Sequence, residues 1–252
     1  MKDSKPKLSI IIPVLNNITG LKATIDSINS QLFRDFEVWI IDGKSSEETQ
    51  EYLRTLSAPF FYKTQRDSGI YEAMNTGVLM AKGDWLYFLG AEDVFYTPDT
   101  LRNVFKKQIT GRANLISGRI IYEGSTIPFV YSKKKRVKYP SWSFAMWIRN
   151  GLHHQGTFYR SSLFLAMEYN LDYKTLADYG VNLQLYQKKE TCVLLEETIA
   201  KCNSDGVSKV GSWELYLEEI DLKLALSSPL FLPFFYILAF MKYMSKKIVM
   251  HD

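Results

Sequence analysis

The sequence has few of the residues on which several common kinds of functional site depend. Only two of its 252 residues are cysteines, Cys192 and Cys202. They form no metal-ligand spacing and no disulfide framework, so we expect two reduced thiols. The 31 basic and 27 acidic residues leave a formal net charge of +4. This mild excess does not amount to the footprint of a nucleic-acid-binding protein, and we expect no nucleic-acid partner.

Two phosphate-binding motifs are missing as well. The first expected strand is not followed by GxGxxG, and the sequence contains no GxxxxGK[ST]. A dinucleotide cofactor on a glycine-rich turn and the phosphate loop of the common nucleotide triphosphatases are therefore disfavoured. A site that binds a phosphorylated ligand here must hold the anion in another way.

No apolar run is long enough for a membrane span. The segment 1–12 is not typical of a signal peptide, because its short apolar stretch leads directly into Pro13. We therefore expect the chain to stay in the cytoplasm. The segment 230–241 is apolar apart from Pro233, but as a helix it would reach only about 18 Å, against about 30 Å for a bilayer core.

Two interpretations of this apolar C-terminal segment stay open. It can pack on the rest of the protein, or it can lie in a membrane interface, where Lys242, Lys246 and Lys247 would meet anionic lipids. The density of phenylalanine favours an interfacial or oligomeric contact. We therefore expect peripheral attachment to the inner face of the cell membrane, or a homo-oligomer.

Strand-like and helix-like segments alternate through the first ninety residues. Short apolar runs predict strands at 8–14, 36–42, 60–64 and 85–89, and helical spacing of apolar residues predicts helices at 18–32, 46–56 and 70–82. Such alternation indicates an α/β fold with a parallel sheet and right-handed crossovers. Further strands are expected at 115–123 and 191–197.

Polar side chains follow each of the four strands. Ligands bind at the carboxyl ends of strands in such sheets, so these residues should share one edge, although each alone could simply form a turn. Two adjacent carboxylates at one strand end repel each other unless a cation is present. Magnesium or manganese, which prefer oxygen ligands, would fit there together with a diphosphate. The residues are Asn16 and Asn17, Asp42, Asp67, and the pair Glu92 and Asp93.

Six segments together resemble the family 2 glycosyltransferases, in particular those of bacterial polysaccharide biosynthesis. The third is the most telling, because its Asp-Ser-Gly-Ile-Tyr and Ala-Met-Asn elements are followed by the acidic strand end. The segments are LSIIIPVLNN (8–17), VWIIDGKSSEET (38–49), RDSGIYEAMNTGVLMAKGDWLYFLGAED (66–93), HHQGTFYR (153–160), ADYGVNLQLY (177–186) and SDGVS (204–208).

The resemblance implies a GT-A, Rossmann-like fold, with three α/β/α layers, a mostly parallel central sheet and a C-terminal helical tail. The implied organisation is a glycosyltransferase domain at 1–210, with a nucleotide-sugar half to about 97 and an acceptor half from 98, followed by a helical region at 211–252. The implied reaction transfers a sugar, with inversion, from a nucleotide-diphosphate-sugar to a saccharide or lipid-linked acceptor in surface polysaccharide biosynthesis. A Mn²⁺ or Mg²⁺ ion is the implied cofactor.

The resemblance also implies roles for individual residues. Asp178 matches the catalytic base, and Asp93 and Glu92 match the acidic metal motif, with Asp93 the more direct ligand. The residues expected to contact the donor are Pro13, Asn16, Asn17, Asp42, Asp67, Asn75, Glu92 and His154. The segment 204–208 resembles a loop that closes over the donor phosphates.

Alternatives stay open at several of these residues. Asp178 can instead be a helix N-cap, and one of His153 and His154 is expected to face the site, since neighbours on an extended segment point to opposite sides. The sequence departs from the family at Gly90, where Asn or Asp is common, and at Glu92, where Asp is common.

A third departure and two rival functions complete the predictions. Gly180 stands where an acidic residue often follows the Asp-Tyr pair. The rival functions are a non-catalytic nucleotide-sugar-binding protein on the same fold and a sugar nucleotidyltransferase. The second would need a glycine- and arginine-rich phosphate loop after the first strand, which this sequence lacks.

Overall fold

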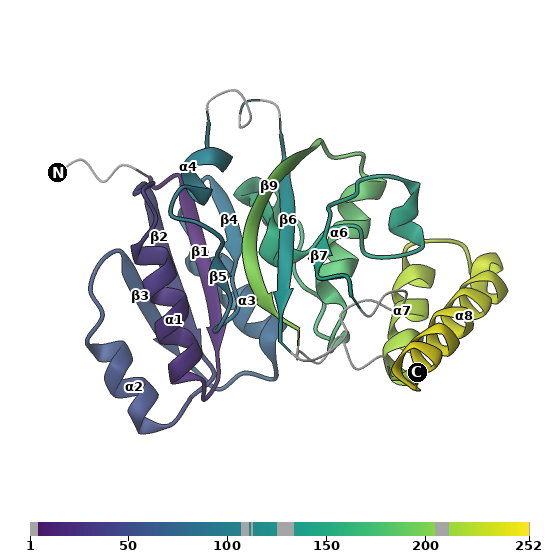
Figure 1. Cartoon of the computed structure of the whole chain (residues 1–252), viewed down its shortest axis with the longest axis horizontal. Helices are drawn as coiled ribbons and strands as arrows, with labels where there is room; N and C mark the ends of the chain where they lie inside the picture. The colour runs from purple at the N-terminus through teal and green to yellow at the C-terminus, as the bar shows by residue number, and fades with distance from the viewer. Residues whose placement is uncertain (1–4, 107–110, 112, 125–133, 205–211, 252) are drawn as a thin grey trace.

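A nine-stranded sheet runs through the computed structural model, which describes residues 5–106, 111, 113–124, 134–204 and 212–251 (Figure 1). In the described residues the strand order is β3-β2-β1-β4-β8-β6-β9-β5, and β7 pairs with β6. The strands are β1 (Leu8–Val14), β2 (Phe36–Asp42), β3 (Phe60–Thr64), β4 (Trp85–Phe88), β5 (Val94–Phe95), β6 (Leu115–Glu123), β7 (Val137–Lys138), β8 (Thr157–Arg160) and β9 (Cys192–Asn203).

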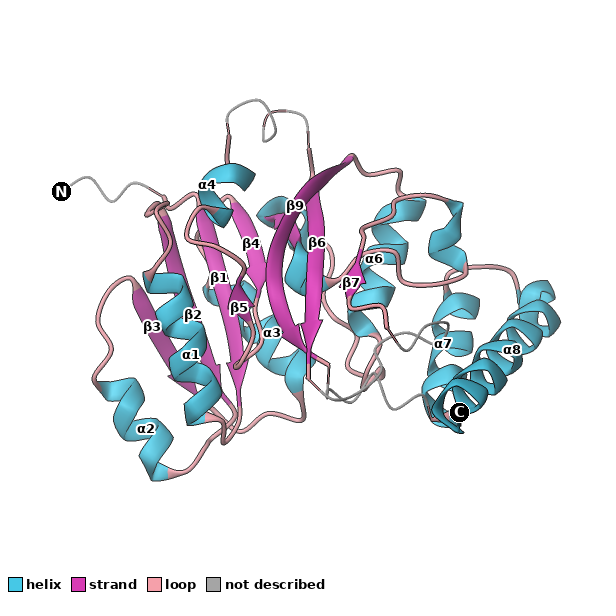
Figure 2. Cartoon of the chain, in the orientation of Figure 1, coloured by secondary structure: helices cyan, strands magenta, loops and turns pink. Residues whose placement is uncertain are grey.

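Helices connect the strands and form the C-terminal end of the chain (Figure 2). The described residues of the second half include the short 3₁₀ helices η1 (Phe144–Trp147), η2 (His154–Gly156), η3 (Ser161–Leu165) and η5 (Pro229–Phe231). The α-helices are α1 (Ile18–Asn29), α2 (Glu47–Arg54), α3 (Ile70–Met80), α4 (Thr100–Val104), α6 (Ala177–Gln187), α7 (Trp213–Ala225) and α8 (Leu232–His251).

The sheet is mostly parallel, as the sequence predicts. The pairings β1–β2, β2–β3, β1–β4 and β6–β9 are parallel. Strand β8 lies between β4 and β6 and is antiparallel to both. Of the strands in the described part, only β5, β7 and β8 therefore run against the others, so the carboxyl ends of β1 to β4 lie at one edge.

Helices cover both faces of this sheet, which gives the expected three layers. Ile10 and Ile12 of β1 point to the face covered by α1, α2 and α4, and belong to one buried cluster with Leu21 and Leu53. Ile11 points to the opposite face and packs in a second cluster with residues of α3 and α6. These three β1 residues are 0% exposed, so β1 is buried on both faces, as its β-branched run predicts.

The predicted boundaries agree with the structure except at a few ends. The strand expected at 115–123 is β6, with the same bounds, whereas the strand expected at 191–197 continues to Asn203 as β9. This extension runs beside β6 and β5 and brings Asn203 to the tip that follows β4. A sequence reading that ends β9 at 197 misses this residue at the site.

The two C-terminal helices pack beside α6. Leu222 of α7 lies in a buried cluster with Tyr179 and Leu183 of α6. Phe235 of α8 packs in turn on Tyr216 of α7. None of the helices in the described part of the chain combines the length and the apolar character that a membrane span requires.

Candidate active site

A tight turn after β4 carries the two adjacent acids. The Thr24 hydroxyl of α1 accepts a hydrogen bond from the Glu92 backbone N–H at 2.9 Å and donates to the Asp93 carbonyl at the same distance. Glu92 has φ 114°, a backbone conformation that residues other than glycine rarely adopt. Strain of this kind costs about 1–3 kcal/mol and gathers at functional sites.

Asp93 is turned into the protein. It is 5% exposed, and its Oδ1 accepts the backbone N–H of Asn203 at 3.0 Å, while Oδ2 accepts a short hydrogen bond from the Gln155 side chain. Burial raises the pKa of Asp93 to about 6, although the Asn203 N–H, the neighbouring His154 and Gln155 all favour its ionised form. The carboxylate is therefore held by hydrogen bonds in a fixed direction.

Gly90 allows this direction. A Cβ at position 90 would lie 2.4 Å from Asp93 Oδ2, closer than any real contact. The Asn or Asp that the family commonly has at this position would push the Asp93 carboxylate away from Gln155. Glu92 is exposed instead, and its Oε1 accepts a hydrogen bond from the Asn203 amide at 3.1 Å.

The ends of β1 to β3 form an acidic, hydrogen-bonded edge. Asn16 accepts the Ser46 N–H at 2.9 Å, and its own N–H donates to Ser45 Oγ at 2.8 Å. Asp42 Oδ1 accepts the Ser45 N–H at 3.0 Å, and its buried Oδ2 has no hydrogen-bond partner among the described residues. A buried acceptor of this kind suits the N–H or O–H of a ligand.

Asp67 lies beside this edge. A Cβ on Gly43, the residue after Asp42, would be 3.1 Å from Asp67 Oδ2. Burial raises the pKa of Asp67, and the carboxylates of Glu72 and Asp42 raise it further. Two carboxylates facing the same space suit the hydrogen-bond donors of a nucleoside.

Two further residues that were expected to contact the donor, Asn17 and Pro13, lie at or near the end of β1. Asn17 caps α1 through the Gly20 N–H at 2.9 Å and donates to the Ala91 carbonyl at 3.0 Å, which ties the end of β1 to the acidic turn. Pro13 is half-buried within β1.

The structure does not bring Asn75 to this group. Its amide forms two hydrogen bonds with the backbone of Tyr169, at 2.8 and 2.9 Å. Both the oxygen and the nitrogen of the Asn75 amide are therefore occupied. These hydrogen bonds join α3 to the segment before α6.

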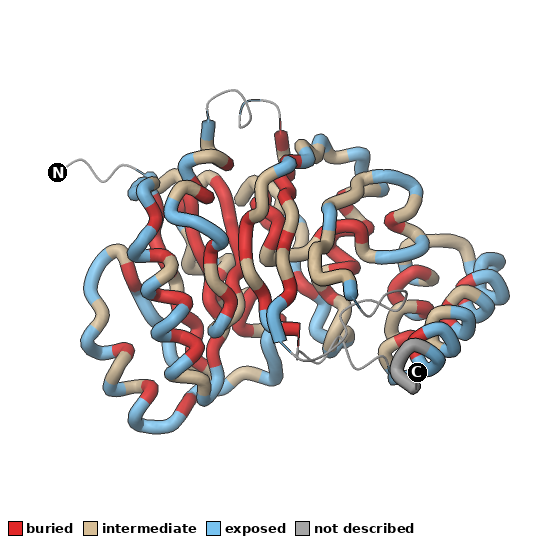
Figure 3. The backbone as a smooth tube through the Cα atoms, viewed as in Figure 1, coloured by how far each residue is buried: buried red, intermediate tan, exposed pale blue. Residues whose placement is uncertain are grey.

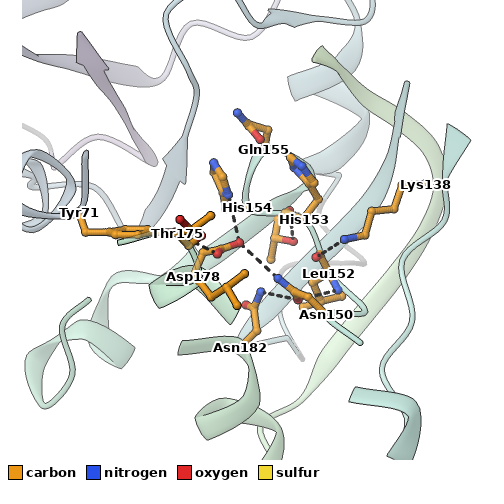
Figure 4. Close-up of polar contacts among 12 residues, drawn as sticks. Tyr71, Lys138, Asn150, Leu152, His153, His154, Gln155, Thr175, Asp178 and Asn182 are labelled. Carbon is orange, nitrogen blue, oxygen red and sulfur yellow. Dashed lines mark hydrogen bonds and ion pairs between the residues drawn. The ribbon is translucent and has the colours of Figure 1, made fainter. Parts of the chain in front are cut away.

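Asp178 lies in the first turn of α6, inside the fold. Its side chain is 13% exposed. Oδ1 lies 3.2 Å from the Tyr71 hydroxyl, and Oδ2 lies 3.3 Å from both the Asn150 amide and His154 Nδ1 (Figure 4). The N-cap of α6 is Leu176, so the interpretation of Asp178 as a helix N-cap is wrong.

Asp178 stays ionised in this environment. Burial raises its pKa, but the hydrogen bond and charge of His154, the charge of Lys138 and the backbone N–H of Tyr179 lower it more, so that the pKa lies below its ordinary value. A carboxylate of this kind is ready to accept a proton at neutral pH.

Two consecutive residues connect the two acids. His154 contacts Asp178, and the next residue, Gln155, donates to Asp93. Asp93 and Asp178 are therefore linked through two adjacent residues, although they are 85 positions apart in the sequence. Gln155 Oε1 is buried and has no hydrogen-bond partner among the described residues.

Both histidines of the HHQG segment face the same cavity. Their rings stack at 5.1 Å, and His153 also contacts the Tyr122 ring. The expectation that only one faces the site fails because the 3₁₀ helix η2 begins at His154, so the segment is no longer extended there.

A cavity of about 330 Å³ opens beside Asp178. Its wall includes His153 and His154, the β7 segment, and residues of α7 and α8. The lining includes Asp178 but not Asp93. The loop at 204–208 cannot be compared with its expected role, because residues 205–208 lie outside the described part of the chain.

The acidic turn has the chemistry that a hard divalent cation requires. Glu92 offers an exposed carboxylate, and Asp93 Oδ2 and the unpartnered Gln155 Oε1 lie close by. Among the described residues no three His, Cys, Asp or Glu side chains form a metal cage. Magnesium and manganese are commonly held by one or two carboxylates, with substrate phosphates as further ligands, so the residues fit such an ion.

Several functional contacts have no signal in the sequence. Glu218 of α7 accepts three backbone N–H groups at the start of α6, those of Lys174, Thr175 and Leu176, at 3.2, 2.8 and 2.6 Å. Its carboxylate therefore holds the backbone that leads into Asp178. Gly180 lies at a second α6–α7 contact, where a Cβ would be 3.3 Å from the Leu222 side chain, so any larger residue there would require Leu222 to shift.

We expect Glu218→Ala to lower kcat by about tenfold, since a small displacement of a catalytic group costs rate rather than binding. The affinity for the nucleotide-sugar donor should stay within about twofold, because the acidic edge expected to bind it is built from the ends of β1 to β3 and not from α7. Steady-state kinetics and donor titration would check both. Asp221→Ala is the matched control, because Asp221 is an exposed acid on the same helix. Equal kinetics in the two variants would contradict the positioning role.

Comparison with known proteins identifies the family. Residues 9–171 match the model of glycosyl transferase family 2. The chain belongs to this family. It is 34% identical over 194 residues to the PGL/p-HBAD biosynthesis glycosyltransferases of Mycobacterium bovis and Mycobacterium tuberculosis, covering 72% of this chain and 70% of theirs. The chain is therefore a glycosyltransferase.

Solved structures agree on the GT-A fold. The S. aureus TarS 1–349 structure in complex with UDP-GlcNAc superposes with a TM-score of 0.65 at 16% identity, over 87% of this chain and 66% of that one. The mannosyltransferase PcManGT from Pyrobaculum calidifontis, in complex with GDP-Man and Mn²⁺, gives a TM-score of 0.63 at 15% identity, over 98% of this chain and 74% of that one. At these identities the likeness shows the fold alone.

Proposed function

We propose that this family 2 glycosyltransferase is metal-dependent and inverting. It moves a sugar from a nucleotide-diphosphate-sugar to a hydroxyl of a saccharide or lipid-linked acceptor in surface polysaccharide or glycolipid biosynthesis. The observation that carries the proposal is that two adjacent residues contact two different acids, Asp93 and Asp178. Gln155 holds Asp93 beside the exposed Glu92, and the adjacent His154 contacts the ionised Asp178.

The two acids support the two halves of a single displacement. Asp178 accepts the proton of the acceptor hydroxyl, whose oxygen forms the new bond to the sugar carbon while the bond to the diphosphate breaks on the opposite side. A base in this position contributes about 10²- to 10⁴-fold. Glu92 and Asp93 would hold a divalent ion, which supplies Lewis-acid stabilisation of the departing diphosphate when bound.

The acidic edge of β1 to β3 supports binding of the nucleoside. The unpartnered Asp42 Oδ2 and the Asp67 carboxylate accept the hydrogen-bond donors of a base and a ribose. The nucleotide-sugar half at 1–97 and the acceptor half at 98–210 remain the proposed division of the domain. TarS and PcManGT carry a nucleotide-sugar in their structures, which agrees with this proposal.

Thermal unfolding provides the direct test of donor and metal. A ligand that binds only the folded protein raises its stability in proportion to the logarithm of its concentration over Kd. We expect UDP or GDP to raise Tm by several degrees with Mn²⁺ and by much less without it, because Glu92 and Asp93 would hold the ion and the ion would offset the negative charge of the diphosphate. Nucleoside monophosphates serve as the control, since they lack the bridging diphosphate. Equal shifts with and without Mn²⁺ would contradict the metal-dependent site.

We further propose that the enzyme works at the inner face of the cell membrane. The support is the apolar outer surface of the C-terminal helix, which would bring the cavity at Asp178 to a lipid-linked acceptor. Self-association through the same helix is the competing explanation of this surface.

A further inference from the structure

The outer side of α8 is covered by large apolar side chains. Between residues 230 and 244 every exposed residue is apolar or aromatic, and Figure 3 shows the outer side of this helix as largely exposed. Exposed fractions range from 39% for Leu232 to 88% for Leu230. We call this set the α8 face: Leu230, Phe231, Leu232, Phe234, Tyr236, Ile237, Phe240, Met241, Met244 and Ile248.

The opposite side of the same helix is packed. Phe235 and Ala239 are 4% and 3% exposed and lie in a cluster with Tyr216 and Ile220 of α7. With 3.6 residues per turn, the positions of the α8 face from Tyr236 round to Phe234 cover about 160° of the helix circumference. One side of α8 is thus fixed to the fold, and nearly half of the helix is apolar and uncovered.

Two of the three lysines of α8 that were expected to meet lipid headgroups are turned away from solvent, and only Lys247 of the three is exposed. Lys242 pairs with Glu219 and donates to the Ile148 carbonyl at 2.6 Å, and Lys246 is 4% exposed. Lys247 lies over the Tyr243 ring, at 4.6 Å. With one exposed lysine beside many exposed apolar residues, the attraction of this helix to a membrane comes mainly from its apolar side chains.

The width of the α8 face argues against a second copy as its partner. A helix pair buries a seam of two positions in seven, so a facing helix would leave Tyr236 and Phe240 uncovered. Protein interfaces also carry about one hydrogen bond per 100–200 Å², whereas the α8 face offers little beyond the Tyr236 hydroxyl. The acyl boundary of a lipid monolayer covers a wide apolar arc and requires no hydrogen bonds.

The packed side of α8, next to the α8 face, borders the cavity beside Asp178. Lys242 of α8, together with Leu215, Tyr216 and Glu219 of α7, forms part of the wall of the cavity that contains Asp178. We propose that the α8 face lies in the lipid–water interface and that the acceptor is a membrane-borne amphiphile, whose hydroxyl enters this cavity. The second part of the proposal rests on the proposed glycosyltransferase function.

Vesicle flotation of the full chain tests the surface directly. We expect the chain to float with pure phosphatidylcholine vesicles and to remain bound at high salt, because apolar contacts are not screened. The triple variant Phe234→Ser, Ile237→Ser, Met241→Ser should lose at least about tenfold in bound fraction, since each side chain buried in lipid contributes in proportion to its apolar area.

The matched control replaces exposed apolar side chains by serine at positions outside α8. Leu79 and Leu165 are 85% and 87% exposed and line a different cavity, so Leu79→Ser with Leu165→Ser should float like the wild type. Equal flotation of the triple variant and the wild type, or binding that requires phosphatidylglycerol and disappears with salt, would overturn the proposal. The single variant Ile237→Ser should show a smaller loss in the same direction if the triple variant is unstable.

Two further measurements separate the competing outcomes. Light scattering after size exclusion would reveal a dimer that the triple substitution abolishes, and this result would replace lipid by a second copy. Donor hydrolysis without lipid should be equal in wild type and triple variant, because none of the three residues lies at the catalytic site. If no donor is turned over while flotation behaves as expected, the proposed enzyme function fails and the lipid surface stands.

Discussion

Replacing Asp178 by Asn should lower the rate of sugar transfer by about 10²- to 10⁴-fold, the usual contribution of a positioned base. The amide keeps the shape of the side chain and its contacts with Tyr71 and Asn150 but cannot accept the proton. Donor binding should be unchanged, because Asp42, Asp67 and the acidic turn are not altered. Single-turnover transfer and donor titration would measure the two quantities separately.

The pH profile of the wild type distinguishes Asp178 from His154 as the base. Because His154, Lys138 and the Tyr179 N–H lower the pKa of Asp178 in spite of burial, this acid is protonated only below its ordinary range, near pH 4. With saturating metal, kcat should therefore stay flat from neutral pH down to about pH 5. A rate that falls on acidification through the ordinary histidine range would assign proton acceptance to the imidazole instead.

Glu92→Gln should raise the Mn²⁺ concentration for half-maximal activity by at least about tenfold, since an amide is a much weaker ligand than a carboxylate for a hard cation. Glu92 is exposed, so Tm should change little. Chelation of the wild type should abolish transfer, and added Mn²⁺ should restore it. The measurement is activity against Mn²⁺ concentration at fixed donor.

Glu123→Gln is the matched control for this metal prediction. Glu123 is a 60% exposed acid at the end of another strand, where it pairs with Lys201. Its replacement should leave the metal requirement unchanged. Because the pKa of Asp93 lies at about 6, protons should compete with the cation below that pH, so the Mn²⁺ requirement of the wild type should rise on acidification. An identical Mn²⁺ curve for the Glu92 variant and the wild type would remove Glu92 from the site.

The first half of the fold, from β1 to β4, was predictable because its signals are local. The β-branched run of β1 and the helical spacing of α1 each lie in one short segment, and the polar residues after the strands follow from the rule that carboxyl ends share an edge. The proximity of Asp178 to the acidic turn followed only from the family resemblance. The spacing of apolar residues does not show that α6 lies near the end of β4, because the two are linked by side-chain contacts of His154 and Gln155.

The second half of the fold was less predictable because its contacts are distant in sequence. Asn203 reaches Asp93 only because β9 continues beyond the segment that its pattern indicates. Glu218 and Lys242 look like ordinary solvated charges on amphipathic helices, and nothing in their spacing shows that each binds backbone of another segment. Asn75 shows the reverse, a residue of a strong motif whose amide is used for packing.

The peptide bond between His154 and Gln155 fixes the separation of two residues that contact different acids. Consecutive Cα atoms are separated by a fixed 3.8 Å. The backbone of His154, which contacts Asp178, and that of Gln155, which contacts Asp93, therefore cannot drift apart. A shift of the backbone at this peptide bond would therefore move both contacts together.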